Sequence, residues 1–332
     1  MSEQLLLDVQ NLTTTFATKE GTILAVNDVS LQLKQGEILG LVGESGSGKS
    51  VTGFSLMRLI DAPGKISDGK ILFKGENLLQ YSEKQMRHLR GNRIAMIFQD
   101  PMMTLNPVLR IDTQMIETLQ AHEKISKKAA WEKSRDMLAL MGVPSPEARL
   151  KLYPHELSGG MRQRVAIAIA LLLQPDLIIA DEPTTALDVT IQAQILSEVQ
   201  KLAKDYGTAL IWITHDLSVI AGLADRVAVM YAGQIVESGT IDQVITDPQH
   251  PYTEGLINSL PSRNVRGQRL RQIKGITPGL LDLPKGCAFA TRCERVQEAC
   301  QQTTSLIEGQ DQHAVRCFFP NHHAPIAQEQ QS

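Results

Sequence analysis

GESGSGKS, residues 43–50, follows the apolar run EILGLV (37–42) and opens a helical pattern at Lys49. The spacing fits G-x-x-x-x-G-K-[ST], a loop whose backbone amides and following helix N-terminus surround phosphate oxygens. Lys49 is expected to reach the β- and γ-phosphates, and the Ser50 hydroxyl to ligate Mg²⁺. A glycine-rich turn can match by coincidence, but the flanking strand and helix are the context that phosphate binding requires. The stretch therefore predicts a nucleotide-binding loop.

Short apolar runs and helical patterns alternate along much of the chain. The expected strands are 5–9, 29–33, 37–42, 70–74, 94–98, 176–181, 209–214, 226–231 and 234–239, and the expected helices are 49–60, 160–173, 189–206 and 217–223. Alternation of this kind favours an α/β fold with a largely parallel sheet. Helices are missing between the early strands, so an antiparallel β piece is expected beside that sheet.

The pattern changes twice along the chain. After DPMMTLNP (100–107) amphipathic helices are expected, and from about Asp247 the chain is rich in Pro, Gly, Gln and Arg and loses strand periodicity. We expect a main domain at 1–245, which carries the nucleotide-binding loop, with a helical subdomain at about 101–165. A loop-rich extension at 246–323 and a disordered tail at 324–332 complete the predicted organisation.

Composition restricts the class of protein. The chain has 332 residues, of which 42% are hydrophobic. Its net charge is −3 and it has no run of like charge, so the composition gives no indication of nucleic-acid binding. The apolar stretch around 165–173 is too short to span a bilayer. The N-terminus MSEQLLLDVQ lacks the basic region of a signal peptide. A cytoplasmic location is expected, with any membrane role supplied by partners.

Polar residues follow three further expected strands. Asp181 and Glu182 end LIIAD, Gln99 follows IAMIF, and His215 follows ALIWIT. Asp181 is expected to hold Mg²⁺ through water and Glu182 to orient and polarise an attacking water. Taken singly, such carboxylates are more often solvated or cap helices, Gln99 is an ordinary surface residue, and His215 caps a helix. Their combination with Lys49 and Ser50 favours the catalytic interpretation.

LSGGMRQR, residues 157–164, begins another helix with two glycines. Backbone amides at a helix start form an anion site, and glycines let a phosphate approach closely. The chain already has one complete set of residues for a nucleotide. We therefore expect Ser158, Gly159 and Gly160 to contact a phosphate held by another subunit.

All four cysteines, Cys287, Cys293, Cys300 and Cys317, fall in the C-terminal segment. A reducing cytosol disfavours disulfides, and structural zinc usually shows C-x2-C knuckles, which are missing here. Four thiolates at wider spacing suit a [4Fe–4S] cluster, with Zn²⁺ or free thiols as the alternatives.

In order along the chain, GESGSGKS, Gln99, LSGGM, LIIADEP, ALD (186–188) and His215 resemble an ABC-transporter ATPase over roughly residues 5–245. The resemblance implies ATP hydrolysis with Mg²⁺, with Glu182 as the catalytic base and His215 and Gln99 as further catalytic groups. It implies that Phe16 stacks on adenine, although a core aromatic is the rival interpretation. The residues expected to contact nucleotide are Phe16, Gly43, Ser45, Gly46, Ser47, Gly48, Lys49, Ser50, Gln99, Asp181, Ser158, Gly159, Gly160 and Asp188. Of these, Ser50, Gln99 and Asp181 are expected to hold Mg²⁺.

DPMMTLNP and PQHPYTEGL (248–256) further resemble the ATPase subunits of dipeptide/oligopeptide importers, which also carry a C-terminal cysteine motif. This implies an ATPase that powers peptide uptake, or uptake of a nickel complex or glutathione. A soluble, non-transport ABC ATPase is the more distant alternative. The implied partners are two transmembrane permease subunits, a paralogous ATPase subunit and, indirectly, a periplasmic or lipid-anchored solute-binding protein. The implied location is the cytoplasmic face of the inner membrane, as a peripheral subunit.

Overall fold

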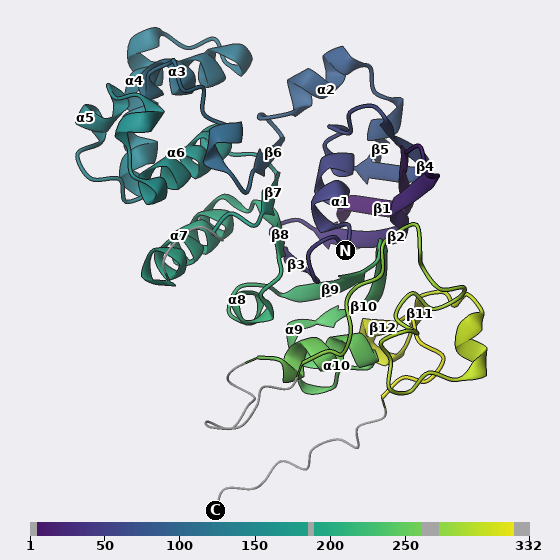
Figure 1. Cartoon of the computed structure of the whole chain (residues 1–332). Helices are drawn as coiled ribbons and strands as arrows, with labels where there is room; N and C mark the ends of the chain where they lie inside the picture. Colours follow the sequence, from purple (N-terminus) through teal and green to yellow (C-terminus); the bar gives the residue numbers. More distant parts are fainter. Residues whose placement is uncertain (1–4, 185–188, 261–271, 322–332) are drawn as a thin grey trace, which may run out of the picture.

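The computed structural model describes residues 5–184, 189–260 and 272–321 (Figure 1). Its strands are β1 Leu5–Ala17, β2 Thr22–Lys34, β3 Ile38–Val42, β4 Gly64–Phe73, β5 Glu76–Asn77, β6 Ile94–Ile97, β7 Leu177–Asp181, β8 Ala209–Thr214, β9 Arg226–Tyr231, β10 Gln234–Thr240, β11 Ile307–Glu308 and β12 Ala314–Val315. Its helices are α1 Lys49–Leu56, α2 Glu83–Leu89, α3 Ile111–His122, α4 Lys127–Leu140, α5 Pro146–Leu150, α6 Gly159–Leu171, α7 Val189–Tyr206, α8 Leu217–Ala221, α9 Ile241–Thr246 and α10 Pro251–Asn258.

Two sheets form the body of the molecule. The larger has the order β11-β12-β10-β9-β3-β8-β7-β6, in which β9, β3, β8, β7 and β6 run parallel and the other three strands pair antiparallel. The smaller sheet, β2-β1-β4-β5, is antiparallel throughout. The α/β fold with an added antiparallel β piece is therefore confirmed.

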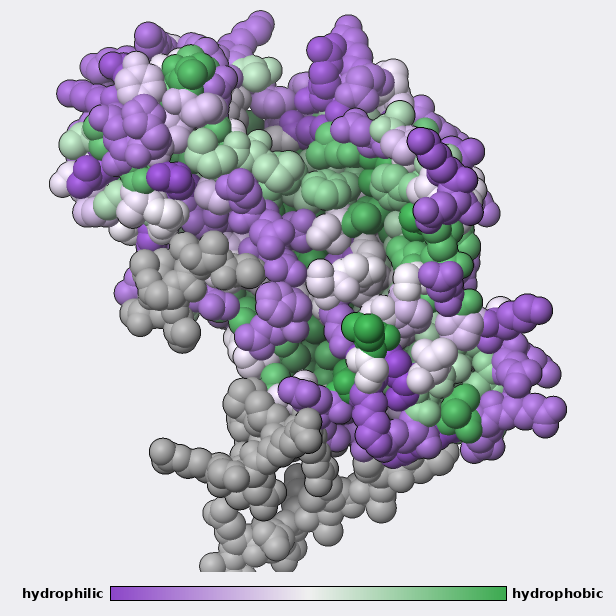
Figure 2. Space-filling model, viewed as in Figure 1, coloured by the Kyte–Doolittle hydropathy of each residue, from purple (hydrophilic) through white to green (hydrophobic). Residues whose placement is uncertain are grey.

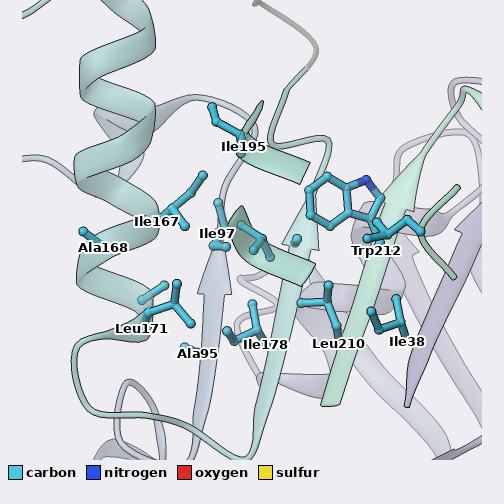
Figure 3. Packing of buried hydrophobic residues seen from close by; sticks show 14 of the residues in the cluster. Ile38, Ala95, Ile97, Ile167, Ala168, Leu171, Ile178, Ile195, Leu210 and Trp212 are labelled. Carbon is cyan, nitrogen blue, oxygen red and sulfur yellow. The ribbon is translucent and has the colours of Figure 1, made fainter. Parts of the chain in front are cut away.

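The central parallel strands are buried on both faces, because their side chains alternate between two cores. On β8, Leu210 and Trp212 face the core that α6 and α7 cover, while Ile211 and Ile213 face the core beneath the antiparallel sheet. Figure 3 shows the first of these cores, where Ile167 of α6 lies over the sheet. This packing places the ends of the parallel strands and the start of α1 at one edge of the sheet.

Helices α3 to α6 gather at one end of the molecule (Figure 1). They pack through buried side chains such as Met115, Leu119 and Leu138, and α6 continues from this group onto the main sheet through Ile167 and Leu171. Helix α6 therefore belongs both to the helical group and to the core of the main sheet.

The C-terminal extension is more closely joined to the body than the sequence predicts. Loss of strand periodicity after Asp247 predicts a separate loop-rich appendage, yet β12 pairs with β10 and adds two short strands to the main sheet. Phe289 is buried against Tyr231 of β9 and Tyr252 of α10. Two-residue strands are too short to produce a detectable alternation.

Several element ends also differ from the prediction. β1 and β2 extend to thirteen residues each, because they pair along most of that length and place polar residues such as Ser30, Gln32 and Lys34 on an exposed face. The helix expected to reach residue 60 ends at Leu56, and Arg58 has a left-handed φ of 52°. The structure places most other ends within two residues of the prediction.

Hydrophilic residues cover much of the surface of the helical group and of the extension on the face shown in Figure 2. Hydrophobic residues gather between them, beside the antiparallel sheet. Among the described residues, none of the helices combines the length and the apolar character needed to cross a bilayer.

Candidate nucleotide-binding site

The loop between β3 and α1 has a shape that two glycines make possible. A Cβ at Gly43 would collide with the carbonyl oxygen of Met230, and one at Gly48 with that of Ala25. Gly48 also has a φ of 100° and caps α1. Only glycine meets both demands without strain. The loop therefore wraps closely around the start of α1, as a phosphate-binding loop does.

Lys49 is the first residue of α1 and is 4% exposed. Its Nζ donates to the carbonyl oxygens of Gly43 at 2.7 Å and Glu44 at 2.9 Å, so the amine lies inside the loop. Burial lowers the pKa of Lys49, and the negative charges of Glu182, Asp181 and Glu44 partly oppose this shift. The arrangement supplies a cation at the centre of the loop.

Asp181, the last residue of β7, lies beside Ser50, the second residue of α1. The Ser50 hydroxyl donates to Oδ1 of Asp181 at 2.9 Å. Asp181 is 4% exposed, and this burial raises its pKa, although the hydrogen bond from Ser50 and the charge of Lys49 act in the other direction. Two adjacent oxygen ligands of this kind suit Mg²⁺, which binds to one or two protein oxygens together with phosphates and water.

Glu182 is held at the end of β7 by an unusual backbone. Its φ is 44°, and its amide donates to the carbonyl oxygen of Ile213 on β8. Such strain in a non-glycine residue is characteristic of functional sites. The side chain meets two neighbours: Oε2 accepts from Nε2 of Gln99 at 3.4 Å and lies 3.2 Å from Nδ1 of His215. Three separate strand ends thus converge on one carboxylate.

These residues line a single cleft of about 850 Å³. The predicted residues on its walls are Ser45, Gly46, Gly48, Lys49, Ser50, Gln99, Glu182 and His215. Asp181 contacts it through Ser50, and Gly43 and Ser47 belong to the same loop. Phe16 does not line the cleft; its ring packs against Gly64 at the end of the β1–β2 hairpin.

Ser158, Gly159 and Gly160 lie elsewhere, at the start of α6. Ser158 caps this helix by accepting from the Met161 amide at 3.4 Å, and both Ser158 and Gly159 are exposed. A Cβ at Gly159 would meet no atom within 4 Å. None of Ser158, Gly159 and Gly160 lines the cleft around Lys49. Asp188 lies outside the described residues.

Cys287, Cys293, Cys300 and Cys317 all line one small, mainly apolar cavity in the extension. Burial raises the pKa of Cys317 to about 11 and also raises the pKa values of Cys287 and Cys293. Among the described residues, however, no group of three or more His, Cys, Asp or Glu side chains is arranged to hold a metal ion. The geometry as it stands does not support the expected cluster or a zinc site.

One set of contacts at the site was not predicted from the sequence. Glu44, the second residue of the loop, is bonded to Arg292, Thr277 and Tyr252, all of which lie in the C-terminal part of the chain. The motif G-x-x-x-x-G-K-[ST] leaves the position of Glu44 open. No pattern in a single sequence connects residues 248 positions apart.

Comparison with known proteins agrees with this geometry. The family model for ABC transporters matches residues 26–185, and that for the oligopeptide/dipeptide transporter C-terminal region matches residues 236–300. The oligopeptide transport ATP-binding protein OppD of Bacillus subtilis is 50% identical over 96% of this chain and 90% of its own length. The dipeptide transport ATP-binding protein DppD of the same organism is 49% identical over 97% and 96%. OppD of Escherichia coli is 49% identical over 95% and 93%.

Solved structures show the same architecture. The ATP-binding cassette MJ0796, in a dimeric post-hydrolysis state bound to ADP and Pi, superposes with a TM-score of 0.65 at 26% identity. The match covers 71% of this chain and 98% of that structure. The fold and the cleft around Lys49 define a nucleotide-hydrolysing ATP-binding cassette. The chain belongs to the ABC transporter family, in the group of ATPases that carry the oligopeptide/dipeptide transporter C-terminal region.

Proposed function

We propose that this chain is the ATP-binding and ATP-hydrolysing subunit of an importer for dipeptides or oligopeptides. The observation that carries the proposal is the convergence of Lys49, Ser50, Gln99, Glu182 and His215 on one cleft in a chain that also has the peptide-transporter C-terminal region. The relatives that share half of its residues are named for oligopeptide or dipeptide transport.

The residues of the cleft divide the chemistry of phosphoryl transfer among them. The loop amides and Lys49 would hold the β- and γ-phosphates. Ser50, Gln99 and Asp181, the last of these through water, would hold Mg²⁺. When bound, Mg²⁺ neutralises charge on the phosphate oxygens. Glu182 accepts a proton from the attacking water. Gln99 and His215 both contact Glu182, and from there they position the water and the γ-phosphate. We also propose that Phe16 stacks on adenine: it does not line the cleft itself, but it belongs to the β1–β2 hairpin whose Ala25 does.

Ser158, Gly159 and Gly160 form part of a second ATP site, which is separate from the cleft around Lys49. The exposure of Ser158 and Gly159 and the open space over Gly159 suit a phosphate approaching from outside the chain. We propose that this phosphate belongs to the ATP of a second, paralogous ATPase subunit. A dimeric relative is consistent with such pairing. Closure of the pair would be the step that drives transport.

The remaining assembly follows from this function. We propose two transmembrane permease subunits that contact the helical subdomain, at about 101–165, and a solute-binding protein outside the membrane. The chain then works as a peripheral subunit on the cytoplasmic side of the membrane. We assign 1–245 to the ATPase domain and 246–323 to the extension; the tail at 324–332 lies outside the described residues.

Peptide uptake by the assembled transporter tests the proposed cargo. Proteoliposomes that contain the chain with its permeases, its partner ATPase and its binding protein should accumulate a labelled dipeptide or oligopeptide only with ATP on the ATPase side. A nickel complex and glutathione, supplied separately, should accumulate at least about tenfold more slowly. A tenfold difference between two solutes requires a difference in binding free energy of only about 1.4 kcal/mol. If the nickel complex or glutathione accumulates faster than the peptide, that solute is the cargo of the transporter.

We propose further that the four cysteines bind a [4Fe–4S] cluster that fixes the extension. In support, all four cysteines line one cavity, and thiolate sulfur is the ligand that such clusters require. Protein purified without oxygen should be brown and hold about four iron atoms per chain, and Cys300→Ser should lose the iron. A colourless protein with stoichiometric zinc, or one with no metal, contradicts the assignment.

A further inference from the structure

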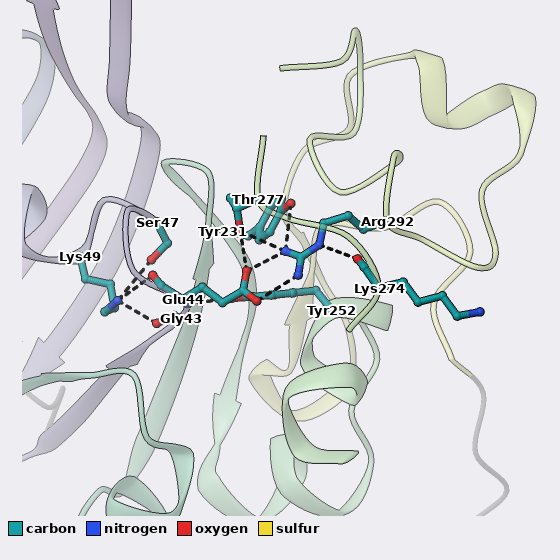
Figure 4. Close-up of polar contacts among 9 residues, drawn as sticks. All are labelled: Gly43, Glu44, Ser47, Lys49, Tyr231, Tyr252, Lys274, Thr277 and Arg292. Carbon is teal, nitrogen blue, oxygen red and sulfur yellow. Dashed lines mark hydrogen bonds and ion pairs between the residues drawn. The ribbon is translucent and has the colours of Figure 1, made fainter. Parts of the chain in front are cut away.

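The carboxylate of Glu44 forms a two-point ion pair with Arg292. Nη1 of Arg292 donates to Oε2 at 2.6 Å, and Nη2 donates to Oε1 at 3.1 Å. The Thr277 hydroxyl also donates to Oε2, at 2.6 Å. Figure 4 shows the side chain of Glu44 pointing away from Lys49 and toward these residues of the extension. The phosphate-binding loop is thus tied to a segment more than two hundred residues away.

Arg292 is itself held firmly in place. Its side chain is 4% exposed, its Nε donates to the Lys274 carbonyl oxygen at 3.0 Å, and its guanidinium carbon lies 5.8 Å from the ring centres of Tyr231 and Phe289. The Arg292 amide bonds the Phe289 carbonyl oxygen at 3.0 Å, which fixes the loop that carries it. A guanidinium so restrained offers its two donors to Glu44 at little further entropic cost.

The backbone of Glu44 is held at the same point. Its amide donates to the Tyr252 hydroxyl at 2.8 Å, and its carbonyl oxygen accepts from Lys49 at 2.9 Å. A displacement of Glu44 would therefore reach the amine that the phosphates need. The extension therefore contacts the phosphate-binding loop at Glu44, through both its side chain and its backbone.

The charge of Glu44 has a direct consequence for phosphate binding. Burial disfavours ionisation, but hydrogen bonds from Arg292 and Thr277 outweigh it, so the pKa of Glu44 lies below its ordinary value. An ionised carboxylate in a loop that receives a triphosphate repels the ligand and competes for Lys49. The Arg292 guanidinium neutralises that charge and holds the carboxylate pointing away from Lys49.

We propose that Arg292 is a positioning residue for ATP binding, which acts by neutralising Glu44 and holding it away from the phosphate site. The inference rests on the proposed ATPase function. Its effect falls on the affinity for nucleotide and leaves the chemical step alone, because Arg292 does not line the cleft where Gln99, Glu182 and His215 meet.

The test measures the dissociation constant of a fluorescent ATP analogue with Mg²⁺ on the full-length chain. Arg292→Met should raise this constant about tenfold, as loss of one charge-assisted pair implies. In the assembled transporter, the KM for ATP should rise similarly with little change in kcat. The double variant Glu44→Gln, Arg292→Met should return to within about threefold of the wild type, because the repelling charge is gone.

Arg295→Met is the matched control. Arg295 lies on the same segment but pairs with Glu254 of α10 at 3.1 Å, so its loss should change the dissociation constant less than about twofold. Two results overturn the proposal: an unchanged dissociation constant in Arg292→Met, or a weakened one that Glu44→Gln does not rescue, which would make Arg292 only a structural residue. Wild-type protein that binds no ATP would instead reject the ATPase function itself.

Discussion

Glu182→Gln is expected to lower the ATPase rate of the assembled transporter about 10³-fold, a loss within the range measured for general bases. Glutamine keeps the size and the hydrogen-bonding capacity of the side chain, so the contacts with Gln99 and His215 survive. It has no basic oxygen to accept the proton of the attacking water. Lys49, Ser50 and Asp181 are untouched, so ATP should still bind.

The measurement pairs steady-state phosphate release with nucleotide binding in the same preparation. Glu83→Gln is the control, since it removes an exposed carboxylate that pairs with Arg90, outside the helical subdomain and outside the cleft. That control should hydrolyse ATP at close to the wild-type rate. A Glu182→Gln protein that retains more than about a tenth of the activity would show that another group does the work of the general base.

The second large effect is expected at Gly159. Gly159→Asp should reduce ATP hydrolysis by the assembled transporter about 100-fold, because it places a negative charge where a γ-phosphate would approach the amides of α6. The substitution fits the fold: the Cβ enters open space, and an acidic residue in the first turn stabilises a helix. ATP binding to the isolated chain should change little, because Gly159 does not line its own cleft.

Gly159→Ala separates charge from bulk at the same position. Alanine adds the methyl group without the charge, so it should lose less activity than Gly159→Asp. Equal losses would mean that the site excludes any side chain by size alone. An active Gly159→Asp transporter would contradict the assignment of Ser158, Gly159 and Gly160 to a phosphate of the partner subunit.

Much of the parallel core could be predicted because its strands are short, apolar and bounded by turn residues. β8 and β9 match the expected ranges at both ends. The loop glycines and Lys49 could also be predicted, since their spacing reflects a local chain geometry that the sequence encodes directly. Gln99, Asp181, Glu182 and His215 meet because they follow strands that lie together in a mainly parallel sheet.

The contacts of the extension could not be predicted in this way. β11 and β12 have two residues each, too few to show a period. The pairing of Arg292 with Glu44 depends on how α10 and the cysteine-bearing loop pack against β9, which no local pattern records. Cysteine spacing suggested a shared site, and the structure brings all four side chains to one cavity without arranging them for a metal.

The central claim is that this chain contributes to two ATP sites, one through residues 43–50 and one through Ser158 to Gly160. Orthovanadate trapped in the position of the γ-phosphate can be used to cleave nearby backbone under ultraviolet light, so it reports which segments contact that position. In the assembled transporter with ATP and Mg²⁺, we predict cleavage of this chain at both segments. Loss of the lysine in the partner's own phosphate-binding loop should abolish only the cut near Ser158. Cleavage confined to residues 43–50 would contradict the claim.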